Sequence, residues 1–242
     1  MKYIIPLLVI LLTSSVPAYA LLQDNLDGTV TQTRNDGSQL MWLKDANYAK
    51  TSGYDADGWM DWYQAQAWIS YLNNSNHLGY NDWRLPINLP VNGSTYDYTL
   101  TFDGSTDRSV NISAPGTIYA GTTASEMAYL YYVELDNLGR WDIYGNDYQP
   151  GWGLVNTGLF TNMDANWANW SGTEYGTEYG VHFDFVEGYQ HHNWKMQGAN
   201  TGAWAVRSAG VVPEPISSIL FITGGTLLAG RRYFMNREGR NY

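Results

Sequence analysis

Aromatic side chains interleaved with Asp, Asn and Gly offer the clearest binding chemistry in this sequence. Tyr and Trp rings present broad, rigid faces that stack on sugars or peptides at a small cost in conformational entropy. The residues of this pattern that we take as candidate ligand-binding residues are Trp141, Tyr144, Tyr148, Trp152 and Trp167. Trp170 follows them, but it begins an expected strand, so we expect it in the core.

Two pairs of carboxylates could serve as the acid and base of a glycosidase: Glu174 with Glu178, and Asp184 with Glu187. Such pairs are common in any acidic chain. The sequence has no Gly-x-Ser-x-Gly nucleophile motif, phosphate-binding loop or dinucleotide fingerprint. The absence of Cys excludes thiol nucleophiles, disulfides and thiolate metal sites. We therefore predict that the protein is not an enzyme, with a carboxylate-dependent hydrolase as the alternative.

Histidines and acidic loops are the remaining candidates for metal chemistry. The four histidines are His77, His182, His191 and His192. The last three lie near acidic residues in an expected hairpin, but spacing such as His-x-x-x-His is absent, so we expect surface histidines and no metal site. The acidic stretches 24–27, 55–61 and 142–147 could supply oxygen ligands, yet none matches an EF-hand loop. We predict no cofactor, and calcium stays possible without a recognised motif.

The charge distribution excludes one class of partner. Residues 21–212 carry eight basic and 21 acidic side chains, a net charge of −13 against −10 for the whole chain. Binding to phosphate backbones needs clusters of Lys and Arg. We therefore expect no nucleic acid partner.

Both ends of the chain predict export. Residues 1–20 have a basic start, an apolar stretch and a small-residue cleavage site, as in signal peptides handled by the Sec machinery. At the other end, an apolar run over 216–230 follows Pro213, Glu214 and Pro215 and precedes Arg231 and Arg232. This order resembles the PEP-CTERM sorting signal. An ordinary tail anchor is the alternative.

The PEP-CTERM resemblance implies recognition by an exosortase, and membrane attachment through a single C-terminal transmembrane helix before processing. It is typical of bacteria that make exopolysaccharide. We therefore expect a cell-surface or extracellular protein with three parts: a signal peptide at 1–20, a globular domain at 21–210 and a sorting signal at 211–242.

The elements that must position these residues form an α+β pattern. Turns and β-branched residues predict strands between Leu22 and Ala46. Apolar spacing predicts a helix from Trp59 to Asn73, capped by Asp57 or Gly58. A second helix is predicted from a capping box at Thr123 and Glu126 to a close at Gly139. Later strands are predicted to start at Trp170 and Trp194 and to cover 180–186 and 203–207.

One run of residues between the helices is unusual: Asp82, Trp83, Arg84, Leu85 and Pro86. This run and several motifs around it occur in the order typical of the Lcl C-terminal domain family, which the chain resembles over about residues 24–208. The other motifs are Leu40-Met41-Trp42, Trp62 with Ala65, Trp170-Ser171, and Trp204-Ala205-Val206-Arg207. The resemblance implies a C-type lectin-like fold, a twisted antiparallel sheet with two helices and long loops. The chain departs from the family pattern after Pro86, where it has Ile87-Asn88-Leu89-Pro90.

The resemblance does not bring a known site with it. The lectin calcium motifs Glu-Pro-Asn and Trp-Asn-Asp are absent, and so are the cysteines of formylglycine-generating enzymes, which share the broader fold. Arg84 could grip a carboxylate ligand, but we expect it to be part of a fold signature with Trp204 and Arg207, pairing with an acid and capping carbonyls. The expected function is non-enzymatic binding of exopolysaccharide or another surface partner. A purely structural coat protein is a further alternative.

Overall fold

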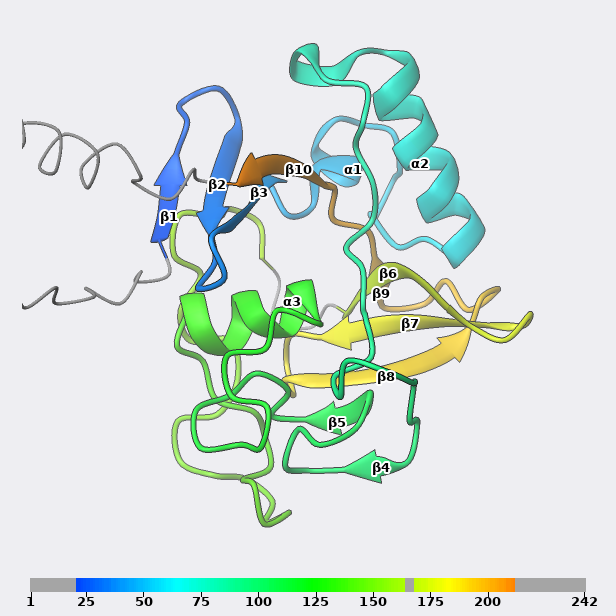
Figure 1. The fold of residues 1–242 in the computed structure, drawn as a ribbon. Coiled ribbons are helices and arrows are strands. Elements are labelled where there is room, and N and C mark those ends of the chain that lie inside the picture. Colours follow the sequence, from blue (N-terminus) through cyan, green and yellow to red (C-terminus); the bar gives the residue numbers. More distant parts are fainter. Residues whose placement is uncertain (1–20, 164–167, 212–242) are drawn as a thin grey trace, which may run out of the picture.

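The computed structural model describes residues 21–163 and 168–211 as an α+β arrangement of two sheets and short helices (Figure 1). The predicted signal peptide, the sorting motif with its apolar helix, and Trp167 lie outside the described residues. Within the described ranges, no helix is long and apolar enough to cross a membrane.

The first sheet is a meander of three strands extended by the last strand of the chain, in the order β1-β2-β3-β10. All its neighbouring strands are antiparallel. The strands are β1 (Leu21–Asp24), β2 (Thr29–Thr33), β3 (Ser38–Leu43) and β10 (Val206–Val211). The strand predicted at 203–207 therefore begins later, at Val206. Trp204 lies just before β10. Its indole is buried in the core, where Nε1 donates to the carbonyl of Leu43 at 2.7 Å.

The second sheet has the order β4-β5-β8-β7-β6-β9 and is built around two antiparallel pairs, β6 with β7 and β7 with β8. Its strands are β4 (Leu100–Thr101), β5 (Arg108–Val110), β6 (Ala168–Tyr175), β7 (Tyr179–Asp184), β8 (Tyr189–Trp194) and β9 (Thr201–Gly202). The prediction that Trp194 starts a strand is wrong. Trp194 ends β8, because the chain turns at Gly188 and pairs back along β7 up to Tyr179.

The first long helix, α2 (Trp62–Asn74), starts three residues later than predicted. Asp61, not Asp57 or Gly58, is its N-cap, and it forms a reciprocal capping box with Gln64. The backbone of Met60 is engaged elsewhere: its N–H donates to Thr201, and its carbonyl accepts from the indole of Trp170. These contacts hold the chain extended up to Asp61. The short helices nearby are α1 (Tyr48–Thr51) and η1 (His77–Gly79).

The predicted second helix is shorter and differently capped. It consists of α3 (Glu126–Tyr129) followed by one π-helical turn, η2 (Leu130–Glu134). Ser125 caps it, whereas the hydroxyl of Thr123 donates to Asp36, so the predicted capping box is wrong. The helix stops well before Gly139, since Asp136 turns the backbone to a φ of 51°. Glu126 does not cap the helix because its carboxylate has another partner.

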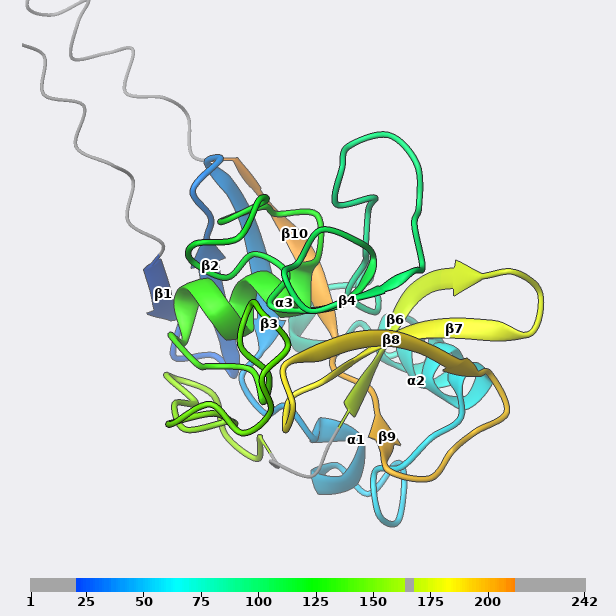
Figure 2. The same cartoon turned by 90° about the horizontal axis from the view of Figure 1, so that it is seen from below.

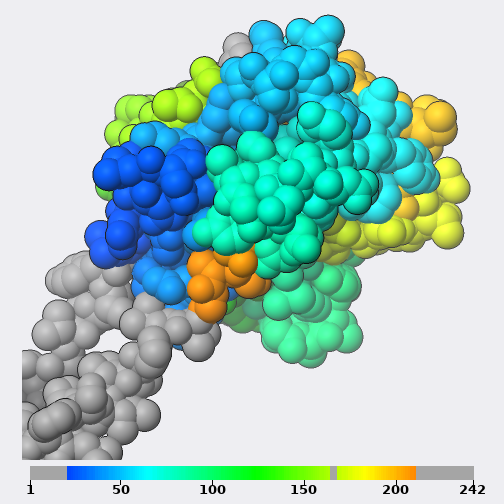
Figure 3. All heavy atoms as spheres, turned by 90° about the horizontal axis from the view of Figure 1, so that it is seen from above, coloured from blue at the N-terminus to red at the C-terminus, as the bar shows by residue number. Residues whose placement is uncertain are grey.

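That partner belongs to a bridging segment, residues 82–88, which joins the two sheets and α3 (Figure 1). Arg84 exchanges two backbone hydrogen bonds with Val206 in the first sheet. Pro86 accepts from the N–H of Gly172 in the second sheet. Viewed from above, β10 (orange) lies between the N-terminal strands (blue) and the part of the chain that follows α2 (teal) (Figure 3).

Arg84 lies at the centre of the bridging segment. Its guanidinium binds Glu126 through two hydrogen bonds of 2.7 and 2.8 Å, and Nη1 also donates to the carbonyl of Leu85. Glu126 is only 3% exposed, and it accepts the N–H of Ile87 as well. A partly buried arginine that pairs with an acid and caps a carbonyl is the architectural role we expected for Arg84. The local geometry after Pro86 is set by these contacts.

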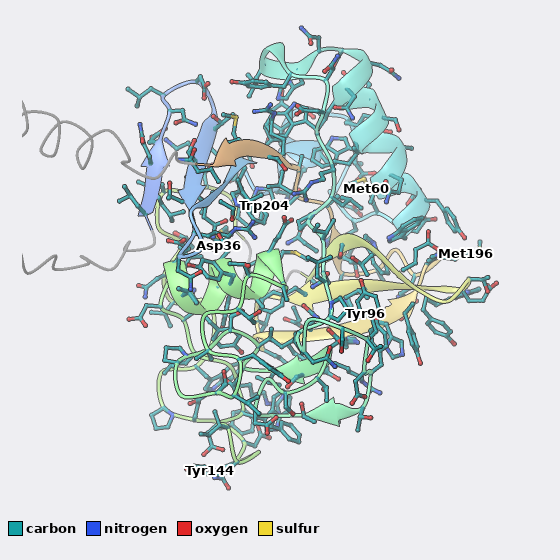
Figure 4. The ribbon with its side chains drawn as sticks, viewed as in Figure 1. Asp36, Met60, Tyr96, Tyr144, Met196 and Trp204 are labelled. Carbon is teal, nitrogen blue, oxygen red and sulfur yellow. The ribbon has the colours of Figure 1, made fainter. Side chains whose placement is uncertain are left out.

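The core lies between the sheets, and most of its largest fully buried side chains are aromatic. Trp42 and Trp204 are fully buried with their ring centroids 4.9 Å apart, and Phe160 packs edge-on against Trp204. Figure 4 places Trp204 in the interior between the first sheet and α3. Trp83 is buried too, and the side-chain amide of Asn73 binds both its N–H and its carbonyl. The end of α2 is thereby tied to the bridging segment.

We predict that Arg84→Ala lowers the free energy of unfolding by about 3 kcal/mol, because it leaves the buried Glu126 without its partner. Chemical denaturation monitored by tryptophan fluorescence measures the loss. Arg207→Ala is the matched control: Arg207 also binds a carboxylate through two nitrogens, but that partner, Asp82, is 53% exposed. Its loss should cost about 1 kcal/mol. Equal losses for the two variants would contradict the central role of Arg84.

Candidate binding cleft

A cleft of about 740 Å³ lies over β7 and β8, next to the loop that leads into β9. This volume is within the range of sites for small-molecule ligands. Its polar lining side chains are His182, Asp184, Glu187, His191, Asn193, Gln197, Asn200 and Thr201. Trp59, 40% exposed, adds an indole to the wall. Carboxylates, amides, hydroxyls and imidazoles in one cleft can serve a ligand that both donates and accepts hydrogen bonds.

The register of the sheet explains why these residues meet. His182 in β7 lies opposite Trp170 in β6 on one side and opposite His191 in β8 on the other. Asp184 is two residues further along β7, and therefore points to the same face. Side chains directly opposite in antiparallel strands are close neighbours. The pairing of β7 with β8 thus places His182, His191 and Asp184 side by side at the floor of the cleft.

His182 is the most unusual residue of the cleft. It is only 4% exposed, and neither ring nitrogen has a hydrogen-bond partner among the described residues. Its ring lies 3.9 Å from that of His191 and 5.5 Å from that of Trp170, measured between centroids. The expectation of surface histidines is therefore wrong for His182, since its strand packs against the next on both sides. A buried imidazole without partners loses hydrogen bonds that a ligand could restore.

The cleft holds its histidines uncharged. Burial keeps the pKa of His182 well below its usual value, with a smaller contribution from the neighbouring histidines. Burial also lowers the pKa of His191 to about 4, and its ring stacks on Tyr189 at 4.6 Å. Burial raises the pKa of Asp184, whose Oδ1 accepts the N–H groups of Val186 and Glu187. In the described ranges, no three His, Asp or Glu side chains are arranged to hold a metal ion.

Three of the predicted ligand-binding residues gather around Arg140 and form an aromatic cluster. The guanidinium of Arg140 lies 4.6 Å from the ring centre of Trp141 and 4.4 Å from that of Tyr148. Trp152 packs edge-on against Tyr148. Tyr144 is apart from the cluster, 83% exposed at the outer end of its loop (Figure 4). Stacking on a cation fixes these rings in place before any ligand binds.

Glu187 joins the aromatic cluster to the cleft. Its carboxylate binds Nη1 of Arg140 at 2.7 Å while it also lines the cleft. Arg140 binds Asp147 on its other side, also at 2.7 Å. Glu187 therefore contacts both the cleft and the cation of the aromatic cluster. Sequence reasoning found the aromatic part from composition. It weighed His182 and His191 only as metal ligands of an expected hairpin, because the sequence does not show that His182 is buried without partners.

Other candidate acids have partners within the described structure. Glu174 binds the ammonium of Lys195 at 2.6 Å, and that ammonium lies 4.7 Å from the ring centre of Trp62. In the predicted calcium loop at 142–147, the carboxylate of Asp142 accepts from Asn146 and from the N–H of Tyr144. These bonds give each carboxylate an architectural role in its own loop or strand.

Comparisons with known proteins add no relative to this description. No protein-family model matches the chain. Neither the curated proteins nor the solved structures contain a significant match.

We predict that His182→Gln makes folding less sensitive to acid. Below a pH of about 6.5, His182 becomes protonated in the unfolded chain but stays neutral in the folded protein. Lowering the pH therefore favours the unfolded state, and the stability of the native protein decreases. Between pH 7 and 5.5, the free energy of unfolding of the variant should fall by about 1 kcal/mol less than that of the native protein. Urea titrations at both pH values measure this difference.

The matched control for that experiment is His77→Gln, which removes a less deeply buried histidine whose pKa burial also lowers. Its effect on the pH dependence should be smaller. If His182→Gln and the native protein lose the same stability over this pH range, His182 is not held uncharged in the folded state.

Proposed function

We propose that the protein is exported, sorted by an exosortase, and displayed at the cell surface or in the extracellular matrix, where it binds polysaccharide without cleaving it. The signal peptide and the Pro-Glu-Pro tail support export and sorting. We further propose that the domain has a C-type lectin-like fold. The α+β class, the two sheets and the long loops between α2 and α3 are compatible with it.

The observation that carries the binding proposal is the unpartnered His182 on the floor of a polar cleft. A neutral imidazole has one donor and one acceptor nitrogen, and a sugar hydroxyl can serve either. Because both nitrogens of His182 are buried, binding to them requires the neighbouring ring of His191 to shift. The amides of Asn193, Gln197 and Asn200 line the same cleft, which suits a ligand with several hydroxyl groups. Beyond Glu187, the ring of Tyr148 offers a surface on which a neighbouring sugar can stack.

The charge of the exported part favours a neutral polymer. Residues 21–212 carry a net charge of −13, and Asp184 and Glu187 line the cleft itself. A polyanionic chain would be repelled by this surface. The protein therefore suits the neutral segments of an exopolysaccharide.

A hydrolase acting on the same polymer is the second candidate function, because burial raises the pKa of Asp184 as a general acid requires. Its partner would be Glu187. That carboxylate already binds Arg140, which favours binding over catalysis. Release of reducing ends from the exopolymer tests this alternative, and Asp184→Asn should abolish any such activity.

The binding proposal is tested with a panel of neutral oligosaccharides and the host's own exopolymer. Asn193→Ala should weaken binding of the full-length protein about 10-fold, because the loss of one or two hydrogen bonds to the ligand costs about 1.4 kcal/mol. Isothermal titration calorimetry measures the affinity. Asn74→Ala, at an exposed amide at the end of α2, should bind like the native protein. No binding of any neutral glycan by the native protein would refute the proposal.

A further inference from the structure

A second aromatic surface lies on the opposite face of the six-stranded sheet. In β8, His192 and Trp194 alternate with His191 and Asn193, so they point away from the cleft. Trp194 lies opposite Tyr179 in the register of β7 and β8. We call this surface the tyrosine shelf. It consists of Tyr96, Tyr98, Tyr175, Tyr179, His192 and Trp194.

The rings of the shelf contact one another closely. Tyr175 lies 4.0 Å from Tyr98 and 4.3 Å from His192, measured between ring centroids. Tyr179 packs edge-on against His192 at 5.5 Å. Tyr96 stacks on Tyr98 at 5.7 Å, and its hydroxyl donates to the carbonyl of Asn88. The loop with Tyr96 and Tyr98 therefore joins three consecutive strands, β6, β7 and β8, in one continuous surface, and Asn88 of the bridging segment anchors one end of it.

The shelf is exposed although it is aromatic. Tyr96 is 44%, Tyr175 38%, Tyr179 43% and Trp194 48% exposed. Burial and the nearby carboxylate of Asp107 raise the pKa of the Tyr96 and Tyr98 hydroxyls, which therefore stay protonated, and the proton of Tyr96 is donated to the carbonyl of Asn88. Soluble proteins rarely expose large contiguous apolar patches, and the patches that they do expose often mark interaction sites.

We propose that the tyrosine shelf is a second binding surface, which takes an extended neutral polysaccharide chain, so that one domain holds two polymer segments. The choice of a neutral polysaccharide rests on the proposed function, whereas the location of the shelf does not depend on it. Occupying both faces of one sheet would raise the avidity for a polymer well above that of either site alone. The protein would thus link chains in a matrix.

Three observations favour polysaccharide over other occupants. The shelf consists of flat rings that carry hydroxyl, imidazole and indole groups, which stack on the C–H faces of sugars while they bind their hydroxyls. The acidic domain disfavours polyanions and anionic membranes. The turn between β6 and β7, which Tyr175 and Tyr179 flank, lies at the end of the molecule opposite β1 and the end of β10 (Figures 1 and 2). This end of the shelf therefore lies far from the end of β10, the last described strand.

The experiment is co-sedimentation of the full-length protein, in mild detergent, with microcrystalline cellulose, chitin, insoluble β-1,3-glucan and alginate gel. We expect the native protein to sediment with at least one of the neutral polymers and not with alginate. Combined Tyr175→Ala and Tyr179→Ala should weaken this binding at least 10-fold. The corresponding double change to Phe keeps the rings and should stay within about threefold of the native affinity.

The matched control is the combined Tyr63→Ala and Tyr71→Ala change, which removes two tyrosines of α2 that are 53% and 51% exposed. It should sediment like the native protein. Circular dichroism on every variant verifies that the fold is retained, and a single Tyr179→Ala change serves if the double variant unfolds. Analytical ultracentrifugation without polymer shows whether the shelf instead binds a second copy of the chain.

The outcomes separate this inference from the proposed function. Both sites are supported if two results are obtained. Asn193→Ala should lose affinity for soluble oligosaccharides but still sediment with insoluble polymer, and the Tyr175→Ala and Tyr179→Ala variant should bind soluble oligosaccharides but no longer sediment with the polymer. If the shelf variant sediments like the native protein, or if it only changes a dimer, the shelf inference is overturned and the cleft is unaffected. Sedimentation with alginate but with no neutral polymer would also overturn it.

Discussion

The ion pair between Arg84 and Glu126 is the interaction on which the rest of the structure depends. A carboxylate that is only 3% exposed must be neutralised and hydrogen-bonded, and Arg84 does both with two nitrogens. The same arginine exchanges backbone hydrogen bonds with β10. One residue therefore fixes the start of α3 relative to the first sheet. Because Thr123 binds Asp36 and Glu126 binds Arg84, the predicted capping box does not form, and Ser125 caps the helix.

The bridging segment also positions the second sheet, where both proposed sites lie. Pro86 binds Gly172 and Ser171 of β6, and Asn88 binds Thr173. β6 in turn sets the register of β7, and β7 that of β8. The alternation of side chains then divides β8 between two faces: His191 goes to the cleft and His192 to the tyrosine shelf. A shift of one residue in register would exchange them.

Several elements followed from local patterns. The helix at 62–74 was predicted within three residues at its start and one at its end, because its apolar spacing is strong and helix periodicity is a local property. Its cap was missed because contacts of Met60 with β9 and Trp170 hold the chain extended. The second helix was predicted too long, since its last turns compete with tertiary contacts of the chain after Leu135. The aromatic residues around Arg140 were recognised from composition, but their common cation was not.

The sequence by itself determined the α+β class, the acidity of residues 21–212 and the absence of Cys, and it predicted export signals at both ends. These are properties of composition and short-range spacing, and they need no knowledge of which segments meet. Only the tertiary structure decided that His182 is buried without hydrogen-bond partners among the described residues, that Glu187 links the aromatic cluster to a cleft, and that Tyr98 packs against Tyr175 in one shelf. Those features depend on strand pairing, which is set by long-range contacts between residues far apart in the chain.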